Sequence, residues 1–138
     1  MALRTPIVLA AVFFAAATAA VANAASPLAN GRAIFLTGRD LAGKQIVAQR
    51  SPMRPSCAAC HRADGSGGVH LPGGAVSADL RHAAMVTHQK HPYTLAMLER
   101  TISTGVDNEG TKLNPVMPHW QLSKTDLHDV AAYVMTLK

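Results

Sequence analysis

The apolar positions divide the chain into an uncharged leader and a body with helical spacing. Ile7 to Ala22 is an unbroken apolar run without charge. Behind it, apolar residues recur at the three- and four-residue intervals of a buried helix face. The pattern predicts a helix from Pro27, a short turn after Ser56, a short helix within 77–86, a longer helix over 92–104 and a last helix after Ser123. We therefore predict an all-α domain with four to five helices.

The predicted helix ends carry the expected signals. Ser26 and Pro27 suit the N-cap and the first helical position, and Gly105 suits a C-terminal cap. The last helix has a capping box over 123–126 and an apolar stripe made of Leu127, Val130, Ala131 and Val134. Gly31 weakens the first helix. Its presence is explained if another helix passes close by.

Long loops separate these helices. Residues 38–55 contain two glycines and two prolines, with room for a short extended piece at 45–48. Residues 65–74 contain five glycines and one proline, which predicts irregular backbone. Long loops in a small domain usually surround something. Aromatic residues make up only 4% of the chain, so a large buried cofactor would supply missing apolar volume.

The leader is typical of export. Arg4 gives a positive start, the apolar run follows, and Ala22-Asn23-Ala24 offers small residues at the cleavage positions. We predict a signal peptide over 1–24, cut after Ala24, and a mature domain over 25–138 that lies in the periplasm or otherwise outside the cytoplasm. The apolar run is shorter than the roughly 20 residues that cross a bilayer, so we expect no transmembrane segment in the mature form.

The charge is modest and diffuse. Without the leader, 12 Lys and Arg stand against 8 Asp and Glu, a net charge of +4. No basic run concentrates this charge, which argues against nucleic-acid binding. A positive surface that steers an acidic partner protein is physically permitted.

The chemistry gathers in the segment Cys57-Ala58-Ala59-Cys60-His61, which holds the only two cysteines of the chain. Cys-x-x-Cys-His is the attachment pattern of c-type haem. On a helical turn the two sulfur atoms share one face, so each can form a thioether with one vinyl group of the same porphyrin. The imidazole that follows is a standard axial ligand of haem iron.

The two cysteines also permit a disulfide, a zinc site or a thioredoxin-like redox pair. A structural disulfide suits an exported protein, and zinc could be held by Cys57, Cys60, His88 and His91. Neither reading gives His61 a role, and 27 residues between the two pairs are too many for a compact zinc finger. A thioredoxin-like pair would need βαβ surroundings that the pattern lacks. Exposed histidines near a helix start are the commoner explanation of His88 and His91.

A second axial ligand is expected downstream. The candidates are Met85, Met97, Met117, Met135 and histidines 70, 82, 88, 91, 119 and 128. Met97 and Met135 lie in predicted helices, where methionine usually fills the core. Met117 lies in a loop between Pro115 and Pro118, which restrict the backbone around a weak thioether ligand. We therefore favour Met117.

These features together resemble the class I cytochromes c, over essentially the whole mature chain. The resemblance rests on Gly31 and Phe35 in the first helix, the haem motif, the Met117-Pro118 pair and the last helix with Tyr133. It implies one covalently bound haem c, and contact of Gly31 and Phe35 with the region of Tyr133. It also implies a proline carbonyl that accepts a hydrogen bond from the haem histidine, for which Pro72 is the matching position.

The resemblance implies a monohaem protein that carries single electrons between redox partner proteins and is no enzyme. Its donor and acceptor stay undetermined. Alternatives are a haem subunit associated with a membrane oxidase or dehydrogenase complex, and an open-site haem enzyme. Residues 38–55 are longer than the simplest members require, so we interpret them as a loop insertion. Trp120 is expected to pack at the haem pocket, with a hydrogen bond to a haem propionate as a further option.

Overall fold

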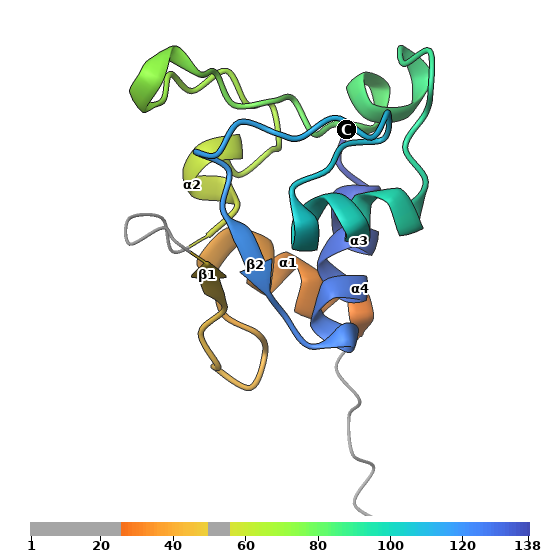
Figure 1. The fold of residues 1–138 in the computed structure, drawn as a ribbon. Coiled ribbons are helices and arrows are strands. Elements are labelled where there is room, and N and C mark those ends of the chain that lie inside the picture. The colour runs from red at the N-terminus through yellow and green to blue at the C-terminus, as the bar shows by residue number, and fades with distance from the viewer. Residues whose placement is uncertain (1–25, 50–55) are drawn as a thin grey trace, which may run out of the picture.

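The computed structural model describes residues 26–49 and 56–138. The elements follow in the order α1 (Pro27–Thr37), β1 (Val47–Gln49), α2 (Ala58–His61), a 3₁₀ turn η1 (Pro72–Gly74), a π-helical turn η2 (Ala83–Thr87), α3 (Leu95–Thr104), β2 (His119–Gln121) and α4 (Lys124–Val134) (Figure 1). The all-α class is confirmed. The predicted leader and its cleavage site, and residues 50–55 of the predicted insertion, lie outside the described residues.

Helices α1 and α4 cross at Gly31, where their backbones nearly touch. A Cβ atom at Gly31 would lie 2.0 Å from the backbone oxygen of Asp129 and 2.8 Å from the Cβ of Tyr133. One turn further along α1, the rings of Phe35 and Tyr133 have centroids 5.5 Å apart. The expected contact of Gly31 and Phe35 with the region of Tyr133 is confirmed, and it explains the glycine inside a helix.

Asn30 adds a polar link at the same crossing. Its side-chain amide donates to Asp126 at 3.0 Å and to Asp129 at 2.9 Å. Its carbonyl oxygen accepts from the backbone N–H of Leu41 at 2.9 Å. The side chain thus joins α1 to α4 and to the start of the loop that follows α1.

The two short strands connect distant parts of the chain. Strand β1 pairs antiparallel with β2, with Ala48 opposite Trp120. The extended piece expected at 45–48 therefore lies slightly later, at 47–49. Because β2 comes directly after Met117 and Pro118, the pairing fastens that loop to the segment before α2.

Two helix ends follow the sequence signals, at Ser123 and Gly105, whereas α3 begins at Leu95 and not at Pro92. The Ser123 hydroxyl accepts from the backbone N–H of Asp126, and the Thr94 hydroxyl caps α3 in the same way. Gly105 ends α3 in the left-handed conformation, with φ 68°. Ser26 occupies the N-cap position of α1, but its side chain makes no capping hydrogen bond. Pro27 has no backbone N–H, so the first turn of α1 has one fewer donor that requires a capping acceptor.

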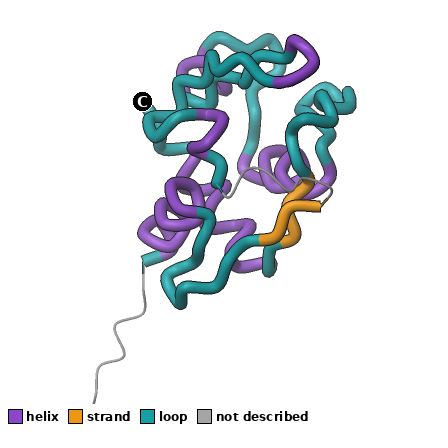
Figure 2. Tube along the Cα trace, turned by 90° about the vertical axis from the view of Figure 1, so that its left-hand side faces the viewer, coloured by secondary structure: helices purple, strands orange, loops and turns teal. Residues whose placement is uncertain are grey.

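The short helix expected within 77–86 begins later than the sequence suggests. Ser77 pairs with the preceding loop, and the backbone N–H of Leu80 donates to Gly65, so 77–80 form no helix. The chain coils from His82, which leads into the π-helical turn η2 at 83–87. Loop backbone accordingly makes up much of the upper half of the molecule in Figure 2. Within the described residues, no helix is long and apolar enough to span a bilayer.

Candidate cofactor pocket

A large cavity opens in the middle of the fold. Its volume is about 440 Å³, and its walls come from α1, α2, η2, α3, β2, α4 and the loops between them. Core residues of the crossing helices, Phe35, Val130 and Val134, form part of the wall. The wall of the cavity is mostly apolar, with a few polar groups that include thiols, an imidazole and an indole. This is the character of a site that holds a small molecule or cofactor.

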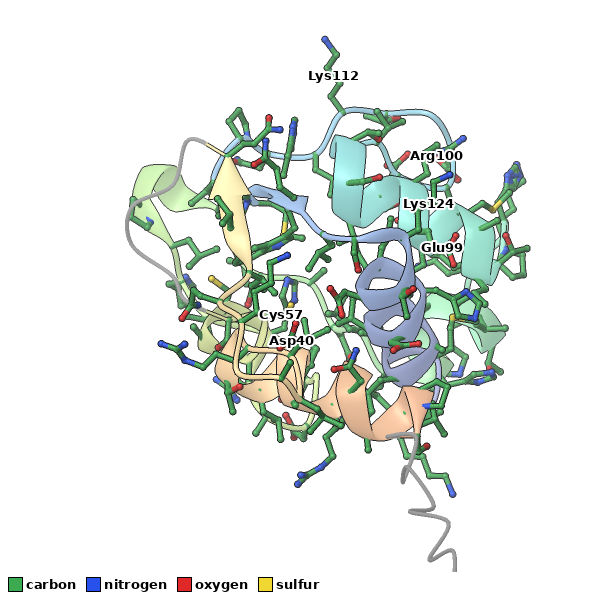
Figure 3. The ribbon with its side chains drawn as sticks, turned by 90° about the horizontal axis from the view of Figure 1, so that it is seen from below. Asp40, Cys57, Glu99, Arg100, Lys112 and Lys124 are labelled. Carbon is green, nitrogen blue, oxygen red and sulfur yellow. The ribbon has the colours of Figure 1, made fainter. Side chains whose placement is uncertain are left out.

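Both cysteines lie on the wall of this cavity, and they do not form a disulfide with each other. The backbone oxygen of Cys57 accepts hydrogen bonds from the N–H groups of Cys60 and His61, at 3.1 and 2.9 Å. This single helical turn places the cysteines on one face, as the spacing predicts. Burial raises the pKa of the Cys57 thiol to about 12. In Figure 3, Cys57 lies towards the middle of the molecule, whereas Lys112 points outward.

His61 is buried, and its ring is oriented by the backbone. The Nδ1 atom lies 2.8 Å from the carbonyl oxygen of Ala78. Because a carbonyl oxygen can only accept, Nδ1 carries the proton and Nε2 keeps its lone pair. Burial lowers the pKa of His61, against the opposing effect of the Ala78 hydrogen bond. The ring is therefore neutral, which is the form that ligates a metal.

The structure corrects the role expected of Pro72. The partner of the His61 ring is the carbonyl of Ala78, and Pro72 is exposed in η1 and absent from the cavity wall. The physical reason is the shape of the loop. His70 faces Val76 in an antiparallel bridge, so Pro72 lies in the turn of a small hairpin, and the returning strand reaches His61 with Ala78.

Met117 lies on the wall, in a turn stiffened by Asn114. The backbone N–H of Met117 donates to the Asn114 carbonyl at 2.9 Å, and that of Val116 donates to the Asn114 side chain at 3.0 Å. Met85 also lies on the wall and is 5% exposed. The other candidates do not line the cavity: Met97, Met135 and histidines 70, 82, 88, 91, 119 and 128. The geometry reduces the candidate second ligands to Met117 and Met85.

Trp120 supplies an independent sign of a missing partner. Its ring is 5% exposed and lines the cavity, and its indole N–H is a buried polar atom without a hydrogen-bond partner among the described residues. An unpaired buried donor costs about 1–3 kcal/mol. An anionic group at the edge of a bound cofactor, such as a haem propionate, would satisfy it.

The donors present suit haem better than zinc. The described residues contain no cluster of three or more His, Cys, Asp or Glu side chains that could hold a metal ion. What they offer is two thiols on one face, a neutral imidazole, thioether sulfur, apolar walls and one unpaired N–H. Cys57 and Cys60 would form thioethers with the porphyrin, His61 would ligate its iron, and Trp120 would meet a propionate.

The comparisons agree with this chemistry. Residues 41–138 match the family model described as cytochrome c. The chain belongs to the cytochrome c family. Its cofactor is therefore covalently attached haem c. The family serves mainly in electron transfer.

A solved structure also resembles this cytochrome. It is described as oxidized SHP, an oxygen-binding cytochrome c, and is 20% identical, with a TM-score of 0.44 over 78% of this chain and 79% of that one. A search of curated proteins finds no match.

Sequence reasoning missed the groups that orient His61. The Ala78 carbonyl is a backbone atom, and the hydroxyl of Ser77 donates to the carbonyl of Cys60 at 2.8 Å. Neither residue type suggests such a role. The only signal in the sequence was the length of the glycine-containing loop. A loop that returns to the haem motif brings a backbone carbonyl beside the imidazole of His61.

Proposed function

We propose that this cytochrome is an exported monohaem carrier of single electrons, with His61 and Met117 as the axial ligands of its iron. One observation carries the proposal. Cys57, Cys60, His61 and Met117, from two parts of the chain more than 50 positions apart, all line the same cavity. The haem supplies a ferric–ferrous couple that takes up and releases one electron.

The residues of the chain hold this couple in place. His61 lies on the cavity wall, and because its Nδ1–H is bonded to Ala78, Nε2 is the nitrogen that would ligate the iron. The turn at Asn114 and the flanking prolines already restrict the backbone around Met117, so little conformational freedom is lost when its sulfur binds iron. Apolar walls keep water away, and methionine ligation raises the reduction potential. With both axial positions filled, no position is open to a substrate, so we propose a carrier and no enzyme.

The carrier acts between two redox proteins. A reduced donor loses one electron to the cytochrome, which passes it to an oxidised acceptor and returns to its starting state. The apolar leader supports export to the periplasm or another space outside the cytoplasm. N-terminal sequencing of the mature protein should begin at Ala25. A start at Met1 would contradict export by a cleaved signal peptide.

Near-infrared absorption of the oxidised holoprotein tests the ligands. A sulfur-to-iron band should be present in the wild type and absent in Met117→Ala. Met85→Ala is the matched control, since Met85 is the other methionine on the cavity wall, and it should keep the band. Loss of the band in Met85→Ala alone would move the ligand to Met85. Its absence from the wild type would indicate an open haem and overturn the carrier proposal.

Two further measurements address attachment and partners. Acid-acetone extraction of the denatured protein should leave the haem on the chain, because thioethers survive it. Extracted haem would refute attachment through Cys57 and Cys60. A carrier should purify as a free protein, and stable co-purification with a membrane oxidase or dehydrogenase would make it a subunit of that complex.

A further inference from the structure

After His61 the chain returns to the haem motif as a small hairpin, residues 67–78. The N–H of Gly68 donates to the Ser77 carbonyl at 2.9 Å, and the N–H of Ser77 donates to the Val69 carbonyl at 3.0 Å. Nearer the tip, the N–H of Leu71 donates to the Ala75 carbonyl at 2.8 Å. These bonds fix the register of the hairpin, so its returning strand presents Ser77 and the next residue at a set position.

The hydroxyl of Ser77 joins this hairpin to helix α2. It accepts from the backbone N–H of Val69 at 2.9 Å and donates to the carbonyl of Cys60 at 2.8 Å. Cys60 lies in the last turn of α2, where helix carbonyls lack partners within the helix. Ser77 is buried, so water competes little for these bonds. One hydroxyl therefore links both strands of the hairpin to the haem motif.

The next residue, Ala78, is held from two sides. Its carbonyl oxygen lies 2.8 Å from Nδ1 of His61. Behind it lies Gly67, at which a Cβ atom would come within 2.2 Å of the same oxygen. Gly67 has φ 62°, which also favours glycine. The acceptor of the His61 proton is thus confined between the imidazole and a backbone that carries no side chain.

We propose that Ser77 is a positioning residue that holds the Ala78 carbonyl against the imidazole of His61 and thereby lowers the reduction potential of the haem iron. This inference rests on the proposed ligation by His61. A carbonyl that accepts the Nδ1 proton makes the imidazole a more basic ligand. A more basic ligand stabilises ferric iron more than ferrous iron. When the Ser77 hydroxyl is lost, its link to α2 is lost and the backbone bond from the Gly67 N–H to the His61 carbonyl remains, so the end of the hairpin at Ala78 is held less firmly. The His61–Ala78 bond then weakens and the potential rises.

The test is a redox titration of the holoprotein with three variants. Ser77→Ala should raise the midpoint potential by about 30 mV, which is about a threefold change in the ferric-to-ferrous ratio for a one-electron couple. Ser77→Thr keeps the hydroxyl and should keep the wild-type potential. Ser66→Ala is the matched control in the same loop, because the Ser66 hydroxyl bonds only to exposed Asp64, at 2.8 Å. An unchanged potential in Ser77→Ala, or an equal shift in Ser66→Ala, overturns the proposal.

Hydrogen exchange in the ferrous wild-type holoprotein gives a second readout that needs no variant. The Nδ1 proton of His61 and the hydroxyl proton of Ser77 should both be protected from exchange with solvent in nuclear magnetic resonance spectra. Free exchange of the Ser77 proton beside a protected His61 proton overturns the positioning role of Ser77 alone. Chemical shifts of a coordinated imidazole, read in the same spectra, test the His61 ligand itself. Their absence overturns the proposed function together with this inference.

Discussion

The close crossing of α1 and α4 makes Gly31→Ala a demanding test of the fold. The new Cβ atom would lie 2.0 Å from the backbone oxygen of Asp129. Contacts of this kind need at least about 3 Å, so the helices must separate by about 1 Å. Overpacking of this kind costs about 1–3 kcal/mol, and backbone on the facing side places the cost near the upper end. The higher helix propensity of alanine relative to glycine offsets about 1 kcal/mol of this cost. We expect a net loss of about 2 kcal/mol.

Denaturant unfolding of the holoprotein, followed by far-ultraviolet circular dichroism, measures this loss. In a thermal scan, a loss of about 2 kcal/mol corresponds to a decrease in Tm of roughly 10 °C. Ala29→Gly is the matched control, since Ala29 is exposed in the same helix and the change costs only propensity, about 1 kcal/mol. If Gly31→Ala is as stable as the wild type or more stable, the two backbones do not meet at this glycine and the reasoning fails.

Three further predictions concern the pocket and its surroundings. Arg62 has φ 62°, a conformation that strains arginine but not glycine. Arg62→Gly should therefore raise the free energy of unfolding, measured with denaturant, by about 1 kcal/mol. A lower free energy of unfolding in this variant would contradict the strain. Trp120→Phe should destabilise the holoprotein by about 2 kcal/mol more than the apoprotein, because only bound haem gives the indole N–H a hydrogen-bond partner. Calorimetry of both forms measures the two losses, and equal losses would refute a haem partner for Trp120. Hydrogen bonds from Arg81 lower the pKa of Asp79, so their contribution to stability is present near neutral pH and is lost as pH falls through the lowered pKa. Asp79→Asn should therefore be less stable than the wild type at pH 6 and equal to it in acid, and a constant difference would contradict this assignment.

The local signals in the sequence predicted two of the helix ends and the helical turn of the haem motif. Ser123 and Gly105 act through neighbours within one turn, and the cysteine spacing acts within a single turn of helix. Gly31 was interpretable because a glycine inside a helix is costly without a close neighbour. In each case the residue type itself determines the local geometry, so the prediction needed no knowledge of distant parts of the chain.

The second ligand shows where sequence reasoning becomes weaker. Met117 was favoured by its prolines, while Met85 was assigned to the end of a short helix. The structure places both sulfur-bearing side chains on the cavity wall. Met85 arrives there because 77–80 form no helix and the chain coils only from His82, which depends on hydrogen bonds to Gly65, Gly68 and Val69. Such long-range pairing leaves no periodic signal in the segment itself.

The His61 partner was assigned to the wrong residue for a deeper reason. Every residue has a backbone carbonyl that can accept a hydrogen bond. The path of the backbone therefore determines which carbonyl accepts the His61 proton, and the type of side chain does not reveal it. Pro72 was chosen by side-chain type, but the hairpin places it in a turn and brings Ala78 to the imidazole. The sequence does show the residue types that allow the backbone to follow this path. Gly67 yields space to the Ala78 carbonyl, and Ser77 binds the hairpin to α2. The side of the pocket behind His61 is therefore specified by residues that need not touch the haem, and substitutions there should alter its potential while leaving all four of the proposed haem-bonding residues intact.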